Sequence, residues 1–221
     1  PPKVVVRAPK FASGDCLGIR LESGQYAAAL VLAADHVIAD GDGFRKVLAG
    51  AFEAAESEDF LVTIGISPDF PSTGYGYLKQ GQNIETASDR SVHQVERFVE
   101  KPDEAEARQY LAEGGYYWNA GMFVWRPQVI LSAISKHAPE LSAGLEDLSA
   151  SWRDSGSIGQ AMDKVYPTLK KISIDFAVME KASNITVVRA DFDWHDVGSF
   201  ASLMALADKD AAGNAVRGDV I

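Results

Sequence analysis

Apolar and polar positions along the chain follow two patterns, one typical of buried strands and one typical of amphipathic helices. Residues 27–33 (AAALVLA) form a continuous apolar run, as expected of a strand that is covered on both faces in a parallel sheet. Within residues 44–59, apolar side chains recur at helical spacing, which predicts a helix with one buried face. The run FLVTIGI at 60–66 predicts the next strand. Together the three segments predict a βαβ unit.

The rest of the chain continues this alternation. The aromatic and β-branched content of YYWNAGMFVW predicts a strand, and Pro102 suits the first position of a helix that stops at a pair of glycines. Strands alternating with helices indicate a layered α/β domain. The further predicted strands are 95–101, 116–125 and 184–190, and the further predicted helices are 102–113, 127–137, 139–152, 157–166, 176–182 and 199–208.

The charge balance of the chain is acidic. It carries 21 Lys and Arg residues against 31 Asp and Glu residues, a net charge of −10. A nucleic-acid groove and a surface that docks on anionic lipid both need concentrated positive charge, so we expect neither nucleic acid nor a membrane as a partner. The acidic net charge does not exclude phosphate ligands, because a few lysines, backbone amides and a bound cation can hold them locally.

The cysteine count and the longest apolar run exclude further classes of protein. Cys16 is the only cysteine, which excludes an intrachain disulfide and a zinc cluster built on thiolates. The first ten residues, PPKVVVRAPK, lack the charged start and apolar core of a signal peptide, and the run at 26–34 is far too short to span a membrane. We therefore expect a cytoplasmic protein.

Polar residues lie at or beyond the ends of several predicted strands, where ligands bind in open α/β sheets. Asp35 follows the first strand and is either a turn or capping residue or a Mg²⁺ ligand, while His36 beside it is expected to be structural or solvent-facing. Gly74 and Gly76 in TGYGYL either form a turn or let the backbone approach a bound sugar or base.

Two further groups have similar alternatives. Glu100 and Lys101 point to opposite sides if the strand continues, which argues against an ion pair between them. They are either a solvated strand end or a phosphate-binding lysine beside a glutamate that accepts from sugar hydroxyls. Asn119 interrupts an apolar strand, and its amide needs partners, either neighbouring backbone or a ligand for which Ala120 and Gly121 make room.

The acidic stretch ADFDWHDVGSF (190–200) looks at first like a metal-binding cluster. If it continues the strand at 184–190, Asp191, Asp193 and His195 share one face, whereas Asp196 lies on the other with the aromatic residues. The pleat therefore separates the candidate ligands, and a metal site formed by this stretch alone is not expected.

Five segments, taken together, resemble the sugar nucleotidyltransferases, and most closely the bacterial mannose-1-phosphate guanylyltransferases. One such segment would be weak support, whereas five in the order of the family, over most of residues 27–207, are strong support. The segments are VLAADHVI, TIGISPDFPSTGYGYLKQG, VERFVEKPDEAEARQYLAEGGYYWNAGMFVWRP, KISIDFAVMEKA and ADFDWHDVGSFASL.

The resemblance implies a Rossmann-like, three-layer αβα nucleotidyltransferase domain with a mixed, mostly parallel sheet. It also implies a Mg²⁺-dependent reaction in which GTP and mannose 1-phosphate give GDP-mannose and pyrophosphate, by in-line attack of the sugar phosphate oxygen on the α-phosphorus. Such a transfer needs no protein nucleophile, so positioning and charge stabilisation would provide the catalysis. A homodimer is compatible with the sequence.

The matching motifs also imply roles for individual residues. Asp35 and Asp196 would hold the catalytic Mg²⁺, and Lys101 would bind the sugar 1-phosphate, so these three are the expected catalytic residues. For Asp175 the alternative, an acid that begins a helix and favours its dipole, stays open. The expected substrate-binding residues are Gly76, Glu100, Lys101, Asn119, Gly121 and Asp175.

The chain departs from the family pattern at its beginning. The family's GGxGTRL signature, which wraps the nucleotide triphosphate, has no equivalent, and SGDCLGIRL (13–21) is only a partial echo of it. We therefore expect an unplaced segment at 1–26, a nucleotidyltransferase core at 27–210 whose N-terminal part is missing or diverged, and the start of a C-terminal extension at 211–221.

This departure leaves two alternatives to the guanylyltransferase interpretation. The first is a non-catalytic domain that binds a sugar nucleotide or has a regulatory role. The second is an enzyme for another pair, such as glucose 1-phosphate with UTP or dTTP. The segments WNAGMFVW and SIDFAVMEK favour mannose.

Overall fold

The computed structural model describes residues 16–20, 26–33, 35–86, 90–207, 209–210 and 213–215. Seven strands form its large sheet, and two short ones form a separate sheet. The large sheet contains β1 (Cys16–Arg20), β2 (Tyr26–Val31), β4 (Leu61–Ile66), β5 (Tyr77–Ile84), β6 (Val92–Val99), β7 (Tyr116–Trp125) and β8 (Ile185–Arg189), in the order β1-β2-β7-β4-β8-β6-β5. The small sheet pairs β3 (His36–Ile38) with β9 (Trp194–Asp196).

Helices cover both faces of the large sheet. On one face α1 and α2 contribute Val47, Ala51 and Tyr110 to a core with β4 and β7, and on the other α3 and η2 contribute Ile134 and Met179 to a second core. The predicted three-layer αβα class is therefore confirmed. The helices and helical turns are α1 (Gly41–Ser57), α2 (Glu104–Glu113), α3 (Pro127–His137), α4 (Pro139–Ser155), α5 (Ile158–Val165), α6 (Phe200–Leu206), η1 (Tyr166–Thr168) and η2 (Asp175–Met179).

The direction of the strands corrects one prediction. The sheet is mixed, as predicted, but of the pairings in the described residues only β4 with β8 is parallel. β2 and β4 flank α1 as the predicted βαβ unit requires, yet β7 lies between them and runs antiparallel to both. The apolar run at 27–33 was interpreted as a sign of a parallel sheet. Helices cover both faces of this sheet, and a strand in such a sheet is buried on both faces whatever its direction, so the run does not indicate how the strand pairs.

Most predicted elements are present with small shifts of their ends. The predicted strand at 116–125 has the bounds of β7. The helix predicted from Pro102 begins later, because Asp103 is its N-cap and forms a capping box with Glu106. Strands β1, β3, β5 and β9 were not predicted.

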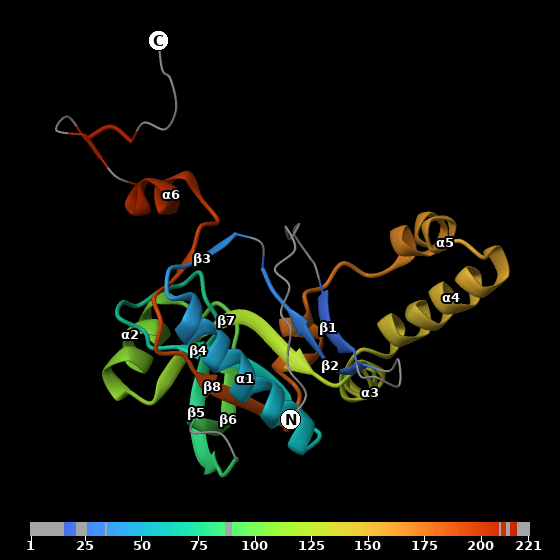
Figure 1. Cartoon of the computed structure of the whole chain (residues 1–221), viewed down its shortest axis with the longest axis horizontal. Coiled ribbons are helices and arrows are strands. Elements are labelled where there is room, and N and C mark those ends of the chain that lie inside the picture. The colour runs from blue at the N-terminus through green and yellow to red at the C-terminus, as the bar shows by residue number, and fades with distance from the viewer. Residues whose placement is uncertain are drawn as a thin grey trace.

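The peripheral parts of the chain contribute less to the core. In Figure 1, α4 and α5 project to one side of the sheet and α6 lies away from it, and α4 has no buried residue. Within the described ranges, no helix has both the length and the apolar character needed to cross a bilayer. Of the predicted segments at 1–26 and 211–221, residues 1–15, 21–25, 211–212 and 216–221 lie outside the described residues.

Candidate functional site

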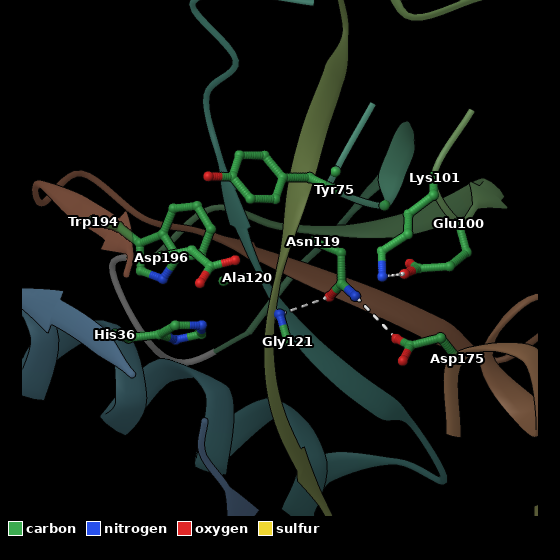
Figure 2. Close-up of a pocket in the computed structure, with 12 residues that line it drawn as sticks. His36, Tyr75, Glu100, Lys101, Asn119, Ala120, Gly121, Asp175, Trp194 and Asp196 are labelled. Carbon is green, nitrogen blue, oxygen red and sulfur yellow. Dashed lines mark hydrogen bonds and ion pairs between the residues drawn. The ribbon is translucent and has the colours of Figure 1, made fainter. Parts of the chain in front are cut away.

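A pocket opens where β7 meets the loop before β5, the turn after β6, the η2 turn and the β3–β9 pair (Figure 2). All of the predicted site residues line this pocket except Asp35, which lies beside it. Segments that are far apart in the sequence therefore converge at one place. The lining residues are His36, Gly74, Tyr75, Gly76, Glu100, Lys101, Asn119, Ala120, Gly121, Asp175, Trp194 and Asp196.

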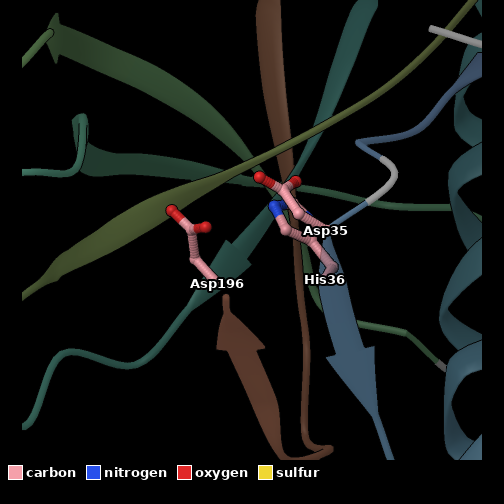
Figure 3. A group of neighbouring side chains, drawn as sticks. All are labelled: Asp35, His36 and Asp196. Atoms are coloured by element: carbon pink, nitrogen blue, oxygen red, sulfur yellow. The ribbon is translucent and has the colours of Figure 1, made fainter. Parts of the chain in front are cut away.

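One side of the pocket holds a group of three potential metal ligands. Asp35, His36 and Asp196 each offer one ligand atom, and these atoms lie within 4.8 Å of one another (Figure 3). The pairing of β3 with β9 places His36 opposite Asp196, and the Val197 N–H donates to the Asp35 carbonyl oxygen at 2.9 Å. The backbone thus fixes the two predicted carboxylates next to each other.

The donor set of this group fits a divalent cation. Two carboxylates are the ligands that Mg²⁺ and Mn²⁺ prefer. Burial lowers the pKa of His36 against the opposing effect of Asp196 and Asp35, which favours the neutral imidazole. Its Nδ1 is buried and has no partner among the described residues, and the ring lies edge-on to Trp194. His36 was expected to be structural or solvent-facing; it is half-buried and lies beside the two carboxylates.

The opposite side of the pocket contains Glu100 and Lys101, and here the prediction about their pairing is wrong. The strand β6 ends at Val99, and Lys101 has a φ of 49° in the left-handed region. This turn brings the Lys101 Nζ to 3.8 Å from the Glu100 Oε1. The two side chains therefore face the same pocket, because the strand alternation that would separate them stops one residue earlier.

Glu100 lies in an unusually acidic environment. Burial, Asp175 and Glu180 raise its pKa to about 7, against the lowering effect of Lys101. The pKa of Asp175 is also raised, by burial. The pocket therefore holds a glutamate that exchanges its proton near neutral pH.

Glu100 should make the folding stability fall as the pH rises. Its pKa is about 7 in the folded state against an ordinary value of 4.5, so the folded state binds more protons between these values. The corresponding stability is present below about pH 4.5 and is lost as the pH rises through about 7. We expect the thermal midpoint to fall more between pH 5 and pH 8 in the wild type than in Glu100→Gln. Glu104→Gln, a change on the exposed face of α2, should retain the wild-type pH dependence; parallel curves for wild type and Glu100→Gln would contradict the assignment.

Asn119 is held by side chains rather than only by neighbouring backbone. The Thr63 hydroxyl donates to its Oδ1 at 2.8 Å, and the Gly121 N–H donates to the same oxygen at 3.2 Å. Its Nδ2 donates to the Asp175 Oδ1 at 3.1 Å. Gly121 has a φ of 65°, a conformation that favours glycine. Sequence reasoning missed Thr63, although it is the lone hydroxyl in the apolar strand LVTIGI.

Gly76 is needed for the position of Glu100. A Cβ at residue 76 would lie 2.5 Å from the Glu100 Oε2 and 3.3 Å from the Asn119 Cβ. The Gly76 carbonyl oxygen also accepts from the Asn119 backbone N–H at 2.8 Å. The glycine therefore lets the backbone before β5 approach both polar side chains.

The acidic stretch at 190–196 does not form one continuous strand. β8 ends at Arg189 and β9 begins at Trp194 in the other sheet, yet side chains still alternate between buried and exposed. Asp191 and Asp193 are exposed, and Asp191 forms an ion pair with Arg90 at 2.8 Å. Only Asp196 among these acids lines the pocket, as expected.

Aromatic rings form one wall of the pocket, at Tyr75 and Trp194. Tyr75 contacts Trp118 and Trp194 edge-on, with ring centroids 5.1 and 5.2 Å apart. Burial, followed by Asp196 and Asp69, raises the pKa of Tyr75, so its hydroxyl stays protonated at neutral pH. The sequence offered one signal for Tyr75, its place between two glycines, but none for its contact with Trp194.

Comparison with known proteins places the chain in a family. Residues 16–213 match the family described as Nucleotidyl transferase. The chain is 40% identical over 192 residues to a mannose-1-phosphate guanylyltransferase of Escherichia coli, a match that covers 87% of this chain and 40% of the relative. It is 42% identical over 193 residues to the alginate biosynthesis protein AlgA of Pseudomonas aeruginosa, covering 87% of this chain and 39% of that protein.

Two solved structures are also similar to this chain. A Thermus thermophilus crystal structure described as a mannose-1-phosphate geranyltransferase matches with a TM-score of 0.70 and 39% identity, over 81% of this chain and 49% of that chain. A mannose-6-phosphate isomerase structure from Helicobacter pylori matches with a TM-score of 0.62 and 29% identity, over 76% and 63% of the two chains. The chain spans about 40% of the length of the curated relatives that it matches.

Proposed function

The chain belongs to the nucleotidyl transferase family, and on this basis we propose that it carries the sugar-phosphate and metal-binding part of a mannose-1-phosphate guanylyltransferase. The reaction would join GTP and mannose 1-phosphate into GDP-mannose with release of pyrophosphate. The relatives at about 40% identity that are named for this activity support the choice of substrates. A cytoplasmic location and a homodimer stay predictions.

The observation that carries the proposal is the presence of two complementary groups in one pocket. Asp35 and Asp196 provide a carboxylate pair at one side. Lys101 provides a positive charge beside Glu100 and Asn119 at the other side. A sugar 1-phosphate needs a cation for its phosphate and hydrogen-bond partners for its hydroxyls, and a nucleotidyl transfer needs a site for a divalent cation.

The protein would contribute by binding and orientation. Lys101 would attract the 1-phosphate, while Glu100, Asn119 and Asp175 would orient the sugar ring through its hydroxyls. Holding the phosphate oxygen in line with the nucleotide converts a bimolecular step into one within a complex. The aromatic wall at Tyr75 and Trp194 would separate the sugar from solvent on one side.

Asp35 and Asp196 would hold the Mg²⁺, with His36 beside them. When bound, such a cation supplies positive charge next to the phosphates and orients them. The fit rests on the two converging carboxylates and on the buried, unpartnered Nδ1 of His36.

A pyrophosphate-release assay tests the proposal. The chain is incubated with Mg²⁺, GTP and mannose 1-phosphate, and with glucose 1-phosphate and UTP or dTTP for comparison. We expect turnover with the first pair. Turnover only with another pair would overturn the specificity, and binding of GDP-mannose without turnover would identify the chain as a non-catalytic binding domain.

A further inference from the structure

Thr63 is a buried polar residue that no substrate can touch directly. It lies in β4, where all six residues are buried, and its own exposure is 0%. A hydrogen-bond partner offsets the water that a buried hydroxyl loses on folding. The partners of Thr63 are the Asn119 Oδ1 at 2.8 Å and the Met122 carbonyl oxygen at 3.3 Å. Its strongest hydrogen bond therefore goes to a side chain of the pocket.

An irregularity in β7 makes this contact. Thr63 pairs with Phe123 and Gly65 pairs with Asn119, so β7 has two more residues than β4 between these pairs. Gly121 lies in the irregularity with its φ of 65°, and its N–H turns back to the Asn119 Oδ1. The oxygen of the Asn119 amide thus has two donors, the Thr63 hydroxyl and the Gly121 N–H.

These two donors fix which end of the amide faces the pocket. A carboxamide accepts through its oxygen and donates twice through its nitrogen. With the oxygen bound to Thr63 and Gly121, the nitrogen faces Asp175, to which one N–H donates (Figure 2). The other N–H is left for a ligand. A reversed amide would place two oxygens against each other at Asp175.

We propose that Thr63 is a positioning residue that makes Asn119 a hydrogen-bond donor to a sugar hydroxyl in this pocket. This inference rests on the proposed function, because that function supplies the sugar phosphate as ligand. The hydroxyl accepts from the Asn119 Nδ2 and donates to the carboxylate of Asp175 or Glu100. Thr63 thereby sets the specificity for the sugar without contacting it.

The neighbouring strand offers a matched control. Thr186 in β8 pairs with Val62 in β4, is 0% exposed, and has a hydroxyl without a partner among the described residues. Thr186→Val therefore makes the same chemical change at a fully buried position of the neighbouring strand, but on the other face of the sheet, away from Asn119. Thr63→Ser keeps the hydroxyl and removes only a methyl group.

Calorimetric binding of mannose 1-phosphate and of inorganic phosphate to the chain tests the proposal. We expect Thr63→Val to weaken the binding of mannose 1-phosphate on the order of 10-fold. The binding of inorganic phosphate should be unchanged, because in the proposed complex only the sugar contacts Asn119. Thr63→Ser should restore binding and Thr186→Val should not alter it. The proposal is overturned if Thr63→Val binds mannose 1-phosphate as Thr186→Val does, or if its affinities for the two ligands fall equally. Failure of Thr63→Ser to restore the binding of mannose 1-phosphate would also overturn it.

A ligand-free measurement separates this inference from the proposed function. The Asn119 side-chain NH₂ signals in a ¹H–¹⁵N spectrum, assigned by their loss in Asn119→Ser, should shift and exchange faster in Thr63→Val but not in Thr186→Val. Unchanged signals would overturn the role of Thr63. If the wild type binds no mannose 1-phosphate while the NH₂ signals respond as expected, the proposed function fails and the positioning role stands.

Discussion

Asp196→Asn is expected to lower Mg²⁺-dependent formation of GDP-mannose on the order of 100-fold or more, the largest effect of any single change in the pocket. Asparagine keeps the size of the side chain but removes the charge that attracts the cation. Asp196 shares its group with Asp35 and His36, so Asp35→Asn should have a comparable effect. Thermal unfolding should be little changed, because Asp196 is only half-buried.

The metal itself provides a readout that is independent of turnover. Binding of Mn²⁺, followed by its paramagnetic resonance signal, should weaken in parallel with activity in Asp196→Asn. Asp193→Asn is the matched control, since it changes an exposed aspartate in the same stretch, outside the pocket. An equal loss of Mn²⁺ binding in Asp193→Asn would contradict the two-carboxylate site, as would full Mn²⁺ binding in Asp196→Asn.

The sequence predicts the class of the fold better than the direction of its strands. β7 has the predicted bounds because YYWNAGMFVW is rich in residues that favour strands, and Pro127 begins the next helix two residues after its end. β5 escaped prediction because five of the eight residues of YLKQGQNI are polar or glycine. Strand direction depends on pairings between distant segments, and a buried strand carries no local signal for it.

In the site too, motifs in the sequence predicted some neighbours, whereas strand register and a turn determined others. The resemblance to sugar nucleotidyltransferases placed Asp35 and Asp196 together, and the structure brings them into one group. His36 joined them through the register of β3 on β9, which the sequence does not reveal. Glu100 and Lys101 were expected to diverge, but the left-handed turn at Lys101 makes them converge.

The conformation of Lys101 indicates how strongly the fold directs this side chain into the pocket. Among the described residues it is the only non-glycine with a positive φ. Such a conformation costs about 1–2 kcal/mol for a residue with a Cβ. The cost is offset by surrounding contacts, among them the hydrogen bond from the Glu100 N–H to the Glu180 Oε1 at 2.9 Å. Strain of this kind is concentrated at functional sites.

Lys101→Met should therefore weaken binding of mannose 1-phosphate by roughly 10- to 100-fold, the range expected for a lost hydrogen bond between charged groups. Methionine keeps the length of the side chain, so the change removes charge rather than volume. Calorimetric titration with mannose 1-phosphate and with inorganic phosphate measures the effect. Both ligands should lose affinity, in contrast to Thr63→Val, because Lys101 acts on the phosphate that they share.

Lys79→Met controls for the change in net charge. Lys79 lies in β5 outside the pocket, where it forms an ion pair with Glu113 at 2.5 Å. If only the change in net charge were responsible, both lysine variants would weaken the binding of phosphate equally. If only Lys101→Met loses affinity for phosphate, the Lys101 ammonium group itself binds the phosphate. The net charge of −10 repels phosphate on average, so its binding requires a local positive charge. The comparison of the two lysine variants therefore separates a local contact from an effect of net charge.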